Sequence, residues 1–290
     1  MLSTLVSYKD RGNYGNNKYR GNCSGYLIKQ LLEFFQPKKV FDPMCGGGTT
    51  GDVCRELKID CVELDLNPVY GGWDALSQEV GESSDLVFWH PPYHDIIKYS
   101  GVYYEFDQRD LSRCSSYGDF INKLNIIQEK LLYSLRKGGR LAILVGDVKK
   151  KGKLYSIQKD INWYGSPEYM IIKEQINTFS SRLQYQGRFI PIAHEYVMIF
   201  KRDDCYIIPQ KVVCPVIKDL RENLNVTWKD IVLAAMEKLG GKASLQRLYQ
   251  EVSSFKKCEG NKFWREKVRQ VLQLYKDFKR LDTGVYSFSF

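Results

Sequence analysis

The sequence predicts an α/β domain followed by a small, mainly helical domain. Over roughly the first 200 residues, short apolar runs that end at glycine, proline or acidic residues alternate with segments of helical spacing. Such alternation is typical of a sheet covered by helices. After residue 226 the pattern changes to three helical segments and one hairpin. With 290 residues, the chain is long enough for both domains.

The first predicted elements are a helix and a short strand. Residues 1–25 predict irregular structure, because Gly, Asn, Tyr and basic residues dominate them. Residues 24–35 carry leucines at helical spacing, and Pro37 ends this helix. Residues 39–41 predict a strand, and residues 50–57 continue as a second helix.

A glycine-rich loop joins that strand to the second helix. Residues 42–50 read Asp-Pro-Met-Cys-Gly-Gly-Gly-Thr-Thr. Glycines at a strand-to-helix turn let the backbone approach a ligand closely and supply positive φ angles. The lysine of a phosphate-binding P-loop and the glycine spacing of a dinucleotide-binding loop are both missing. The loop therefore favours a nucleoside cofactor other than ATP or NAD.

Two further buried strands end at polar side chains. Residues 61–65 end in Asp65, which is suited to accept hydrogen bonds from ribose hydroxyls, although an exposed strand-end acid is the plain alternative. Residues 85–89 run into the sequence His-Pro-Pro-Tyr at 90–93. The two prolines stop this strand because they lack an N–H group. The result is a rigid corner at the carboxyl edge of the sheet, where ligands bind in open α/β folds. An ordinary Pro-Pro turn is the alternative.

The rest of the first domain is less regular. Residues 94–117 form a long polar and aromatic connection, and such connections are usually functional lids or disordered segments. Residues 120–135 predict an amphipathic helix stopped by Lys-Gly-Gly, and residues 140–145 predict an apolar strand. The pattern of residues 148–190 is not decisive. Residues 195–201 predict the last strand of the domain.

The basic residues are concentrated toward the C-terminal end of the chain. The whole chain has a net charge of +9, and residues 206–290 hold 16 Lys and Arg against 9 Asp and Glu. A small basic module beside a nearly neutral domain suggests an anionic polymer such as nucleic acid as partner. A solvated basic face is the alternative.

Several classes of protein and site are not expected. No apolar run approaches the roughly 18 residues needed to span a bilayer, and the N-terminus lacks the apolar core of a signal peptide. The eight cysteines are scattered without a C-x-x-C pair, which predicts reduced thiols in a cytoplasmic protein and no zinc site. His90 and His94 have the i, i+4 spacing of helical metal ligands, but the two prolines between them exclude a regular helix. We therefore expect no membrane contact and no metal.

The N-terminal part resembles a known enzyme family. Residues 42–50 match the D-P-x-x-G-x-G-T-T loop of S-adenosylmethionine-dependent DNA amino-methyltransferases, the N6-adenine/N4-cytosine family. Residues 90–93 match the (D/N/S)-P-P-(Y/F/W) catalytic motif of that family at all but the first position, in the right order. Residues 20–26 lie where the family has a segment that closes over the methionine end of the cofactor. The resemblance implies a Rossmann-like, mostly parallel seven-stranded sheet whose final hairpin includes residues 195–201.

The resemblance also implies a cofactor and its site. The cofactor would be S-adenosyl-L-methionine, with Asp65 bonding the ribose and Asp74 the adenine amino group. Gly46 and Gly48 would give close backbone approach. The complete implied cofactor site is Asn22, Cys23, Asp42, Met44, Cys45, Gly46, Gly48, Thr49, Asp65, Asp74 and Ala75.

The implied catalytic residues are His90, Pro91, Pro92 and Tyr93. An exocyclic amine is a poor nucleophile because its lone pair is delocalised into the ring. The first side chain of the motif and the carbonyl of Pro91 would accept the two amino hydrogens and favour a pyramidal nitrogen. His90 departs from the usual Asp, Asn or Ser, yet a neutral imidazole still has one acceptor nitrogen, which protonation would remove. Tyr93 would stack on a base flipped out of the helix.

The C-terminal module resembles a winged helix. Residues 206–225 predict a linker, and helices are expected to begin at Thr227, Ser244 and Asn261. A hairpin is expected at residues 279–286. In winged helices the third helix enters the major groove, whereas a basic protein-interaction domain is the alternative. The predicted DNA-binding residues are Lys98, Tyr99, Lys262, Arg265, Arg269, Gln273, Lys279 and Arg280.

The sequence therefore predicts a site-specific DNA methyltransferase acting on adenine N6 of double-stranded DNA, of the kind found in restriction–modification. Its predicted domains are a methyltransferase domain at 1–205, the linker at 206–225 and a nucleic-acid-binding domain at 226–290. The alternatives are an N4-cytosine DNA methyltransferase, an RNA amino-methyltransferase, and a nucleic-acid-binding relative that has lost catalysis. The sequence decides neither which bases are recognised nor whether the protein forms a homodimer.

Overall fold

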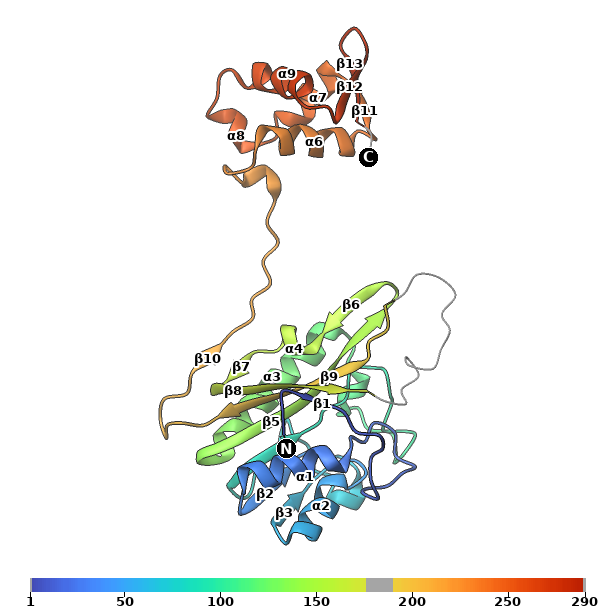
Figure 1. Cartoon of the computed structure of the whole chain (residues 1–290), viewed down its shortest axis with the longest axis vertical. Helices are drawn as coiled ribbons and strands as arrows, with labels where there is room; N and C mark the ends of the chain where they lie inside the picture. Colours follow the sequence, from blue (N-terminus) through green and yellow to red (C-terminus); the bar gives the residue numbers. More distant parts are fainter. Residues whose placement is uncertain (1, 176–189, 289–290) are drawn as a thin grey trace. The chain divides into compact units, whose positions relative to one another are not determined.

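The computed structural model describes residues 2–175 and 190–288 and divides the chain into two compact units (Figure 1). The N-terminal unit is Met1–Val213 and the C-terminal unit is Cys214–Phe290. The boundary falls inside the segment predicted as a linker. Residues 210–211 nevertheless belong to the first unit, because they pair with a strand of that unit.

The N-terminal unit alternates strands and helices. Its strands are β1 (Leu5–Val6), β2 (Lys39–Asp42), β3 (Asp60–Glu63), β4 (Ser84–Trp89), β5 (Leu135–Lys150), β6 (Lys153–Ser156), β7 (Trp163–Tyr164), β8 (Ser166–Glu174), β9 (His194–Lys201) and β10 (Gln210–Lys211). Its helices are α1 (Gly25–Phe35), α2 (Thr49–Leu57), α3 (Tyr117–Ser134) and α4 (Ile157–Asp160), with short 3-10 turns η1 (Pro68–Tyr70) and η2 (Leu111–Arg113).

Seven of these strands form one mixed sheet in the order β1-β8-β9-β5-β4-β2-β3. The strands β3, β2, β4 and β5 are parallel, whereas β9 runs antiparallel to both β5 and β8. This order confirms the Rossmann-like methyltransferase sheet expected from the sequence. The final antiparallel pair, β8 and β9, contains the strand expected at residues 195–201.

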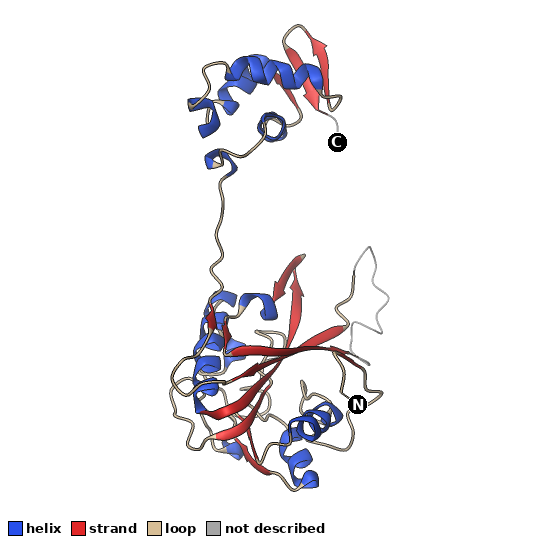
Figure 2. Cartoon of the chain, turned by 60° about the vertical axis from the view of Figure 1, so that its left-hand side comes forward, coloured by secondary structure: helices blue, strands red, loops and turns tan. Residues whose placement is uncertain are grey.

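Helices cover both faces of the sheet (Figure 2). The helices α1 and α2 pack on one face together with Leu86 and Phe88 of β4. The helix α3 packs on the other face with Val87 and Trp89. Because both faces of β4 are buried from Leu86 to Trp89, the sequence of this part of the strand is continuously apolar. This strand stops at His90, at the carboxyl edge of the sheet.

The connection from α3 to β5 differs from the prediction. The helix begins at Tyr117, because the hydroxyl of Ser116 accepts from the backbone N–H of Asp119, and it ends at Ser134. The strand begins at once with Leu135, which is buried and pairs with Ser84 of β4. The Lys-Gly-Gly sequence therefore lies inside β5 instead of stopping the helix, with Gly138 at a φ angle of +82°. The helix itself ends at Ser134, next to the predicted end at residue 135.

The C-terminal unit has its own core and the predicted element order. Its elements are η3 (Leu220–Glu222), α6 (Trp228–Lys238), β11 (Lys242–Ser244), α7 (Leu245–Val252), α8 (Lys256–Glu259), α9 (Trp264–Leu274), β12 (Phe278–Asp282) and β13 (Val285–Phe288). Ile231, Leu248 and Val268, one from each main helix, are fully buried. The sheet order β11-β13-β12 completes a winged-helix-like arrangement. The third main helix begins at Trp264 and not at Asn261, because the short helix α8 and a turn precede it.

No helix in residues 2–175 and 190–288 is long and apolar enough to cross a bilayer.

Candidate cofactor and active site

A cavity of about 70 Å³ lies at the carboxyl edge of the sheet. Six of the residues predicted for the cofactor site and the catalytic motif line it: Met44, Asp65, Asp74, Ala75, His90 and Pro92. Cofactor-loop residues and the catalytic motif therefore face one cavity, although they are far apart in the sequence.

Hydrogen bonds from Asp42 position the glycine-rich loop. This side chain is buried at the end of β2, where one carboxylate oxygen accepts from the backbone N–H of Met44 at 3.1 Å and the other from the hydroxyl of Thr50. Burial raises the pKa of Asp42 to about 7. Gly48 caps α2 at a φ angle of +77°, and a Cβ there would lie 2.7 Å from the hydroxyl oxygen of Tyr70. Glycine is therefore required at this position.

The remaining predicted cofactor residues do not line the cavity. The backbone N–H of Gly46 donates to Asp65 at 3.0 Å, and the side chain of Asn22 donates to the carbonyl of Asn16 at 2.8 Å. Three further side chains are buried and do not line the cavity: Cys23, Cys45 and Thr49. The segment around Asn16 is joined to the loop by a hydrogen bond from the Asn16 N–H to the carbonyl of Gly47 at 2.7 Å.

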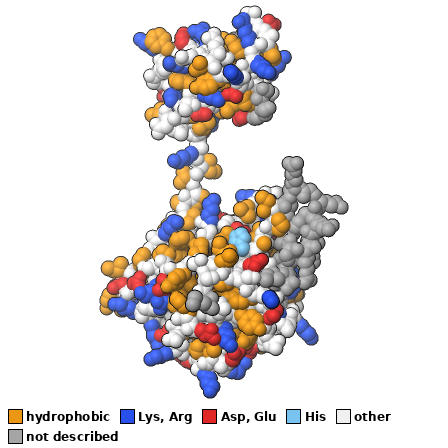
Figure 3. Space-filling view, in the orientation of Figure 1, with side chains coloured by type: hydrophobic (Ala, Val, Ile, Leu, Met, Phe, Trp, Pro, Cys, Tyr) orange, Lys and Arg blue, Asp and Glu red, His pale blue; other side chains and the backbone are white. Residues whose placement is uncertain are grey.

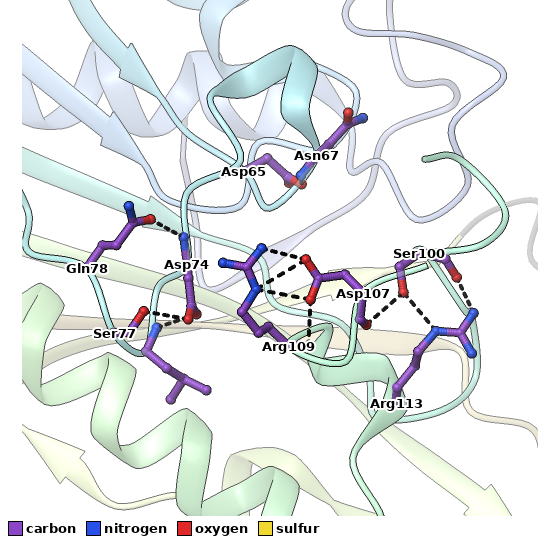
Figure 4. A network of polar contacts seen from close by, with 10 residues as sticks. Asp65, Asn67, Asp74, Ser77, Gln78, Ser100, Asp107, Arg109 and Arg113 are labelled. Carbon is purple, nitrogen blue, oxygen red and sulfur yellow. Dashed lines mark hydrogen bonds and ion pairs between the residues drawn. The ribbon is translucent and has the colours of Figure 1, made fainter. Parts of the chain in front are cut away.

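Two buried carboxylates lie in the cavity wall. Asp65 follows β3 and accepts from the backbone N–H of Asn67 at 2.8 Å in addition to Gly46. Asp74 accepts from the hydroxyl of Ser77 at 2.6 Å and from the backbone N–H of Leu76 at 3.0 Å (Figure 4). Burial raises the pKa of Asp65. Each of these carboxylates keeps acceptor capacity for a ligand, because a carboxylate can accept about four hydrogen bonds.

The long connection at residues 94–117 forms a further wall that the sequence did not assign. Arg109 lies between Asp107, to which it is ion-paired at 2.6 Å, and Asp74 (Figure 4). Asp110 is buried and accepts from the backbone N–H groups of Ser100 and Ser112, both at 2.8 Å. Arg109 and Asp110 both line the cavity. The only sequence signal for them was the unusual length of the connection.

Aromatic side chains from two distant segments meet at the cavity. The ring of Tyr19 stacks on Tyr99, with centroids 5.5 Å apart, and contacts Tyr103 at 4.4 Å. Tyr19 and Tyr99 line the cavity, and the ammonium of Lys98 donates to the carbonyl of Ser112. Lys98 and Tyr99 are the two residues of this connection predicted to bind DNA; Tyr99 lines the cavity, and Lys98 does not.

The catalytic motif leads into a chain of polar contacts. The Nε2 atom of His90 lies 3.0 Å from the hydroxyl oxygen of Tyr93, and the Tyr93 hydroxyl donates to Oε1 of Glu195 at 2.7 Å. The other Glu195 oxygen accepts from Nζ of Lys173 at 2.7 Å. Sequence reasoning did not predict Glu195 or Lys173 as site residues.

The pKa values of His90 and Glu195 depart from the ordinary values of these side chains. Burial lowers the pKa of His90 to about 4, although the charge of Glu195 opposes the shift. Burial also acts to raise the pKa of Glu195, but the positive charge of Lys173 and hydrogen bonds to the carboxylate hold it below its usual value. His90 is therefore neutral, and Glu195 ionised, at neutral pH. An ordinary histidine would titrate near ~6.5.

The lowered pKa of His90 predicts a loss of stability on acidification. Between pH 4 and 6.5 the unfolded chain binds a proton at His90 that the folded chain does not, so folded stability falls as the pH falls through this window. The slope from this group is at most about 1.4 kcal/mol per pH unit. We expect His90→Asn to remove that part of the slope in urea unfolding between pH 4.5 and 7. Equal slopes in the two proteins would place the pKa of His90 near its unfolded value.

The basic residues predicted on the third helix of the C-terminal unit are exposed. Lys262, Arg265, Arg269 and Gln273 lie on or beside α9, and Lys279 and Arg280 lie on β12. The guanidinium of Arg265 lies 4.7 Å from the ring of Trp264, and Arg269 pairs with Glu266 at 3.0 Å. On the face of this unit that Figure 3 shows, Lys and Arg side chains are spread out instead of gathered in one patch.

No family model matches the chain, and no curated protein matches it. Among solved structures, TrmN from Thermus thermophilus aligns over 63% of this chain and 50% of its own, at 15% identity and a TM-score of 0.38. The N-methyltransferase NodS from Bradyrhizobium japonicum, in complex with S-adenosyl-L-homocysteine, aligns over 62% of this chain and 87% of its own, at 10% identity and a TM-score of 0.37.

A third similar structure is TTHA0409, also from Thermus thermophilus, provisionally described as a DNA modification methylase. It aligns over 59% of this chain and 55% of its own, at 18% identity and a TM-score of 0.30. The chain thus spans only about half the length of TrmN and of TTHA0409. These resemblances are distant, and the fold assignment rests on the strand order of the sheet.

Proposed function

We propose that this chain is an S-adenosylmethionine-dependent DNA methyltransferase that modifies adenine N6. The observation that carries the proposal is the position of His90. It follows a buried strand, directly precedes two prolines, and faces the same cavity as Asp65 and Asp74. A hydrogen-bond acceptor on a rigid turn beside a nucleoside site is what methylation of an exocyclic amine requires.

The cavity suits the proposed cofactor chemically. S-adenosylmethionine carries a sulfonium, an ammonium, a ribose diol and an adenine, and it lacks phosphate. Asp65, Asp74 and Asp110 make the cavity acidic, and the cation that lines it, Arg109, is neutralised by Asp107. This charge favours a cationic ligand over a nucleotide. Asp65 would accept from the ribose and Asp74 from the adenine amino group.

His90 and the carbonyl of Pro91 have the proposed role of accepting the two hydrogens of the target amine. Their bonds favour a pyramidal nitrogen whose lone pair is available for attack. A bound S-adenosylmethionine would supply the methyl group, and its sulfur would keep the electron pair of the broken S–C bond as the N–C bond forms. The nitrogen then carries four bonds and a positive charge, and neutral His90 can take the proton it loses.

A matched pair of variants tests the cofactor site. We expect Asp65→Ala to weaken S-adenosylmethionine binding by about 1–3 kcal/mol, because a buried hydrogen-bond partner is removed. Asp60→Ala, an exposed carboxylate at the start of the same strand, is the control and should leave the affinity unchanged. Isothermal titration calorimetry measures both. Unchanged affinity in Asp65→Ala would remove this residue from the site.

The C-terminal unit has the proposed role of holding duplex DNA. Its winged-helix-like order and its exposed basic residues on α9 support this assignment. An RNA amino-methyltransferase is the second candidate, since the chemistry at His90 is the same for an RNA base. Incubation with tritiated S-adenosylmethionine and either duplex DNA or total RNA distinguishes the two. Binding without label transfer to either polymer would favour a catalytically inactive relative.

A further inference from the structure

The contacts beyond His90 determine where its proton lies. Tyr93 has one hydroxyl proton, and it donates that proton to Glu195 at 2.7 Å. The Nε2 atom of His90, 3.0 Å from the same hydroxyl oxygen, must therefore carry a hydrogen in order to bond to it. In a neutral imidazole the other nitrogen, Nδ1, is then unprotonated and can only accept. The chain of contacts thus selects one of two tautomers.

The fold holds Tyr93, Glu195 and Lys173 in fixed positions. Lys173 and Glu195 are direct cross-strand partners in the β8–β9 pair, and both residues are buried. The ring of Tyr93 packs against Gly146 of β5, where a Cβ would lie only 2.8 Å from the ring. Gly146 is itself paired with Glu195 in the sheet. Three adjacent strands therefore hold the phenol, the carboxylate and the ammonium in register.

We propose that Glu195, held by Lys173, is a positioning residue that acts through Tyr93 to fix His90 in its Nε2–H tautomer, leaving Nδ1 as the acceptor for the target amino group. This inference rests on the proposed function for the role of Nδ1, but the tautomer itself does not depend on activity. In this proposal His90, oriented by Tyr93 and Glu195, accepts the hydrogen bond that Asp, Asn or Ser would accept at the first position of the motif.

The opposite arrangement requires a different protonation state. If Tyr93 donated to His90, the Tyr93 oxygen would face Glu195 without a proton between them, unless Glu195 were protonated. The ammonium of Lys173 at 2.7 Å favours the carboxylate form of Glu195. The relay therefore runs from His90 to Tyr93 to Glu195.

This direction makes a specific prediction for Glu195→Gln. Lys173 needs an acceptor, so the new amide turns its oxygen to Lys173 and its NH₂ group to Tyr93. The phenol must then donate to Nε2 of His90, which moves the imidazole proton to Nδ1. A change of one functional group thus converts the proposed acceptor into a donor. We expect turnover to fall by about 10²-fold or more, as when a histidine is held in the wrong tautomer.

Long-range ¹H–¹⁵N NMR correlation of ¹⁵N-histidine-labelled protein reads the tautomer directly, and the chain has only three histidines. We expect the His90 signals, assigned by their loss in His90→Asn, to report the Nε2–H form in the wild type and the Nδ1–H form in Glu195→Gln. Tyr196→Phe is the matched control, because Tyr196 lies 2.8 Å from Nε2 of His194. It should shift the signals of His194 and leave those of His90 and the turnover unchanged.

The double variant Glu195→Gln/Tyr93→Phe distinguishes an effect on the His90 tautomer through Tyr93 from a general loss of structure. Without the phenol, the amide cannot impose the wrong tautomer, so the double variant should be more active than Glu195→Gln alone. A further loss of activity in the double variant, or an Nδ1–H tautomer in the wild type, would overturn the relay. Failure of the proposed function is distinguishable, since a wild type without transferase activity would still show the Nε2–H tautomer.

Discussion

Replacing His90 by alanine is expected to lower methyl-transfer turnover by about 10²- to 10³-fold, comparable to the loss of one preorganised contact to a transition state. The alanine leaves the amino group of the target with the carbonyl of Pro91 as its remaining acceptor from this turn. Single-turnover assays with tritiated cofactor and duplex DNA measure the rate. Cofactor affinity should change little, because the proposed cofactor contacts are made by Asp65 and Asp74.

His90→Asn is the informative companion to this variant. An amide oxygen accepts hydrogen bonds without titrating, so it should recover part of the activity lost in His90→Ala. With the pKa of His90 lowered to about 4, the wild-type rate should be level from pH 5 to 8. An acidic limb near pH 6.5 that disappears in His90→Asn would contradict the burial argument. Unchanged turnover in His90→Ala would remove the residue from the reaction.

Replacing Arg265 and Arg269 together by alanine is expected to weaken duplex binding by roughly 10- to 100-fold at 0.1 M salt. Each arginine that neutralises a phosphate releases about one counterion, so two lost contacts lower the slope of log affinity against log salt by about 2. Both side chains are exposed on α9, one turn apart. Fluorescence anisotropy with a labelled duplex, measured from 50 to 300 mM salt, gives affinity and slope together.

The matched control for this pair lies in the same unit. Lys229→Ala with Lys238→Ala removes the same charge from α6, where the lysines pair with Asp277 and Glu251. The affinity and the slope should then stay near those of the wild type. If both double variants lost affinity equally, the effect would reflect net charge and not α9. If neither double variant lost affinity, the C-terminal unit would bind a partner other than duplex DNA.

The parts of the site encoded by short local patterns were predictable. The strand ending at Asp42, the glycine loop and the Pro-Pro corner each depend on residues next to one another in the chain. Met44, Asp65, Asp74 and His90 line one cavity because successive parallel strands end at the same edge. Local sequence patterns and the topology of the sheet were together sufficient to predict that these residues line one cavity.

The parts of the site that depend on distant pairing were not predictable. Lys173 and Glu195 become partners only through the register of β8 against β9, and a slip of one residue in either strand would put the two side chains on opposite faces of the sheet. Arg109 reaches the cavity from a connection with no regular period. The Lys-Gly-Gly sequence before Arg140 lies in a strand because Leu135 already pairs with Ser84 of β4, a contact between residues that are distant in the sequence.

The two separate hydrophobic cores mean that thermal stability is not a single number for this chain. The core of the C-terminal unit is built from residues of that unit alone, with Ile231, Leu248 and Val268 at its centre. A domain of this size buries a smaller fraction of its surface than the larger N-terminal unit, so its margin against heat is narrower. The chain can therefore pass through a temperature range in which the C-terminal unit has unfolded while the N-terminal unit is still folded, and a single melting midpoint would describe neither transition.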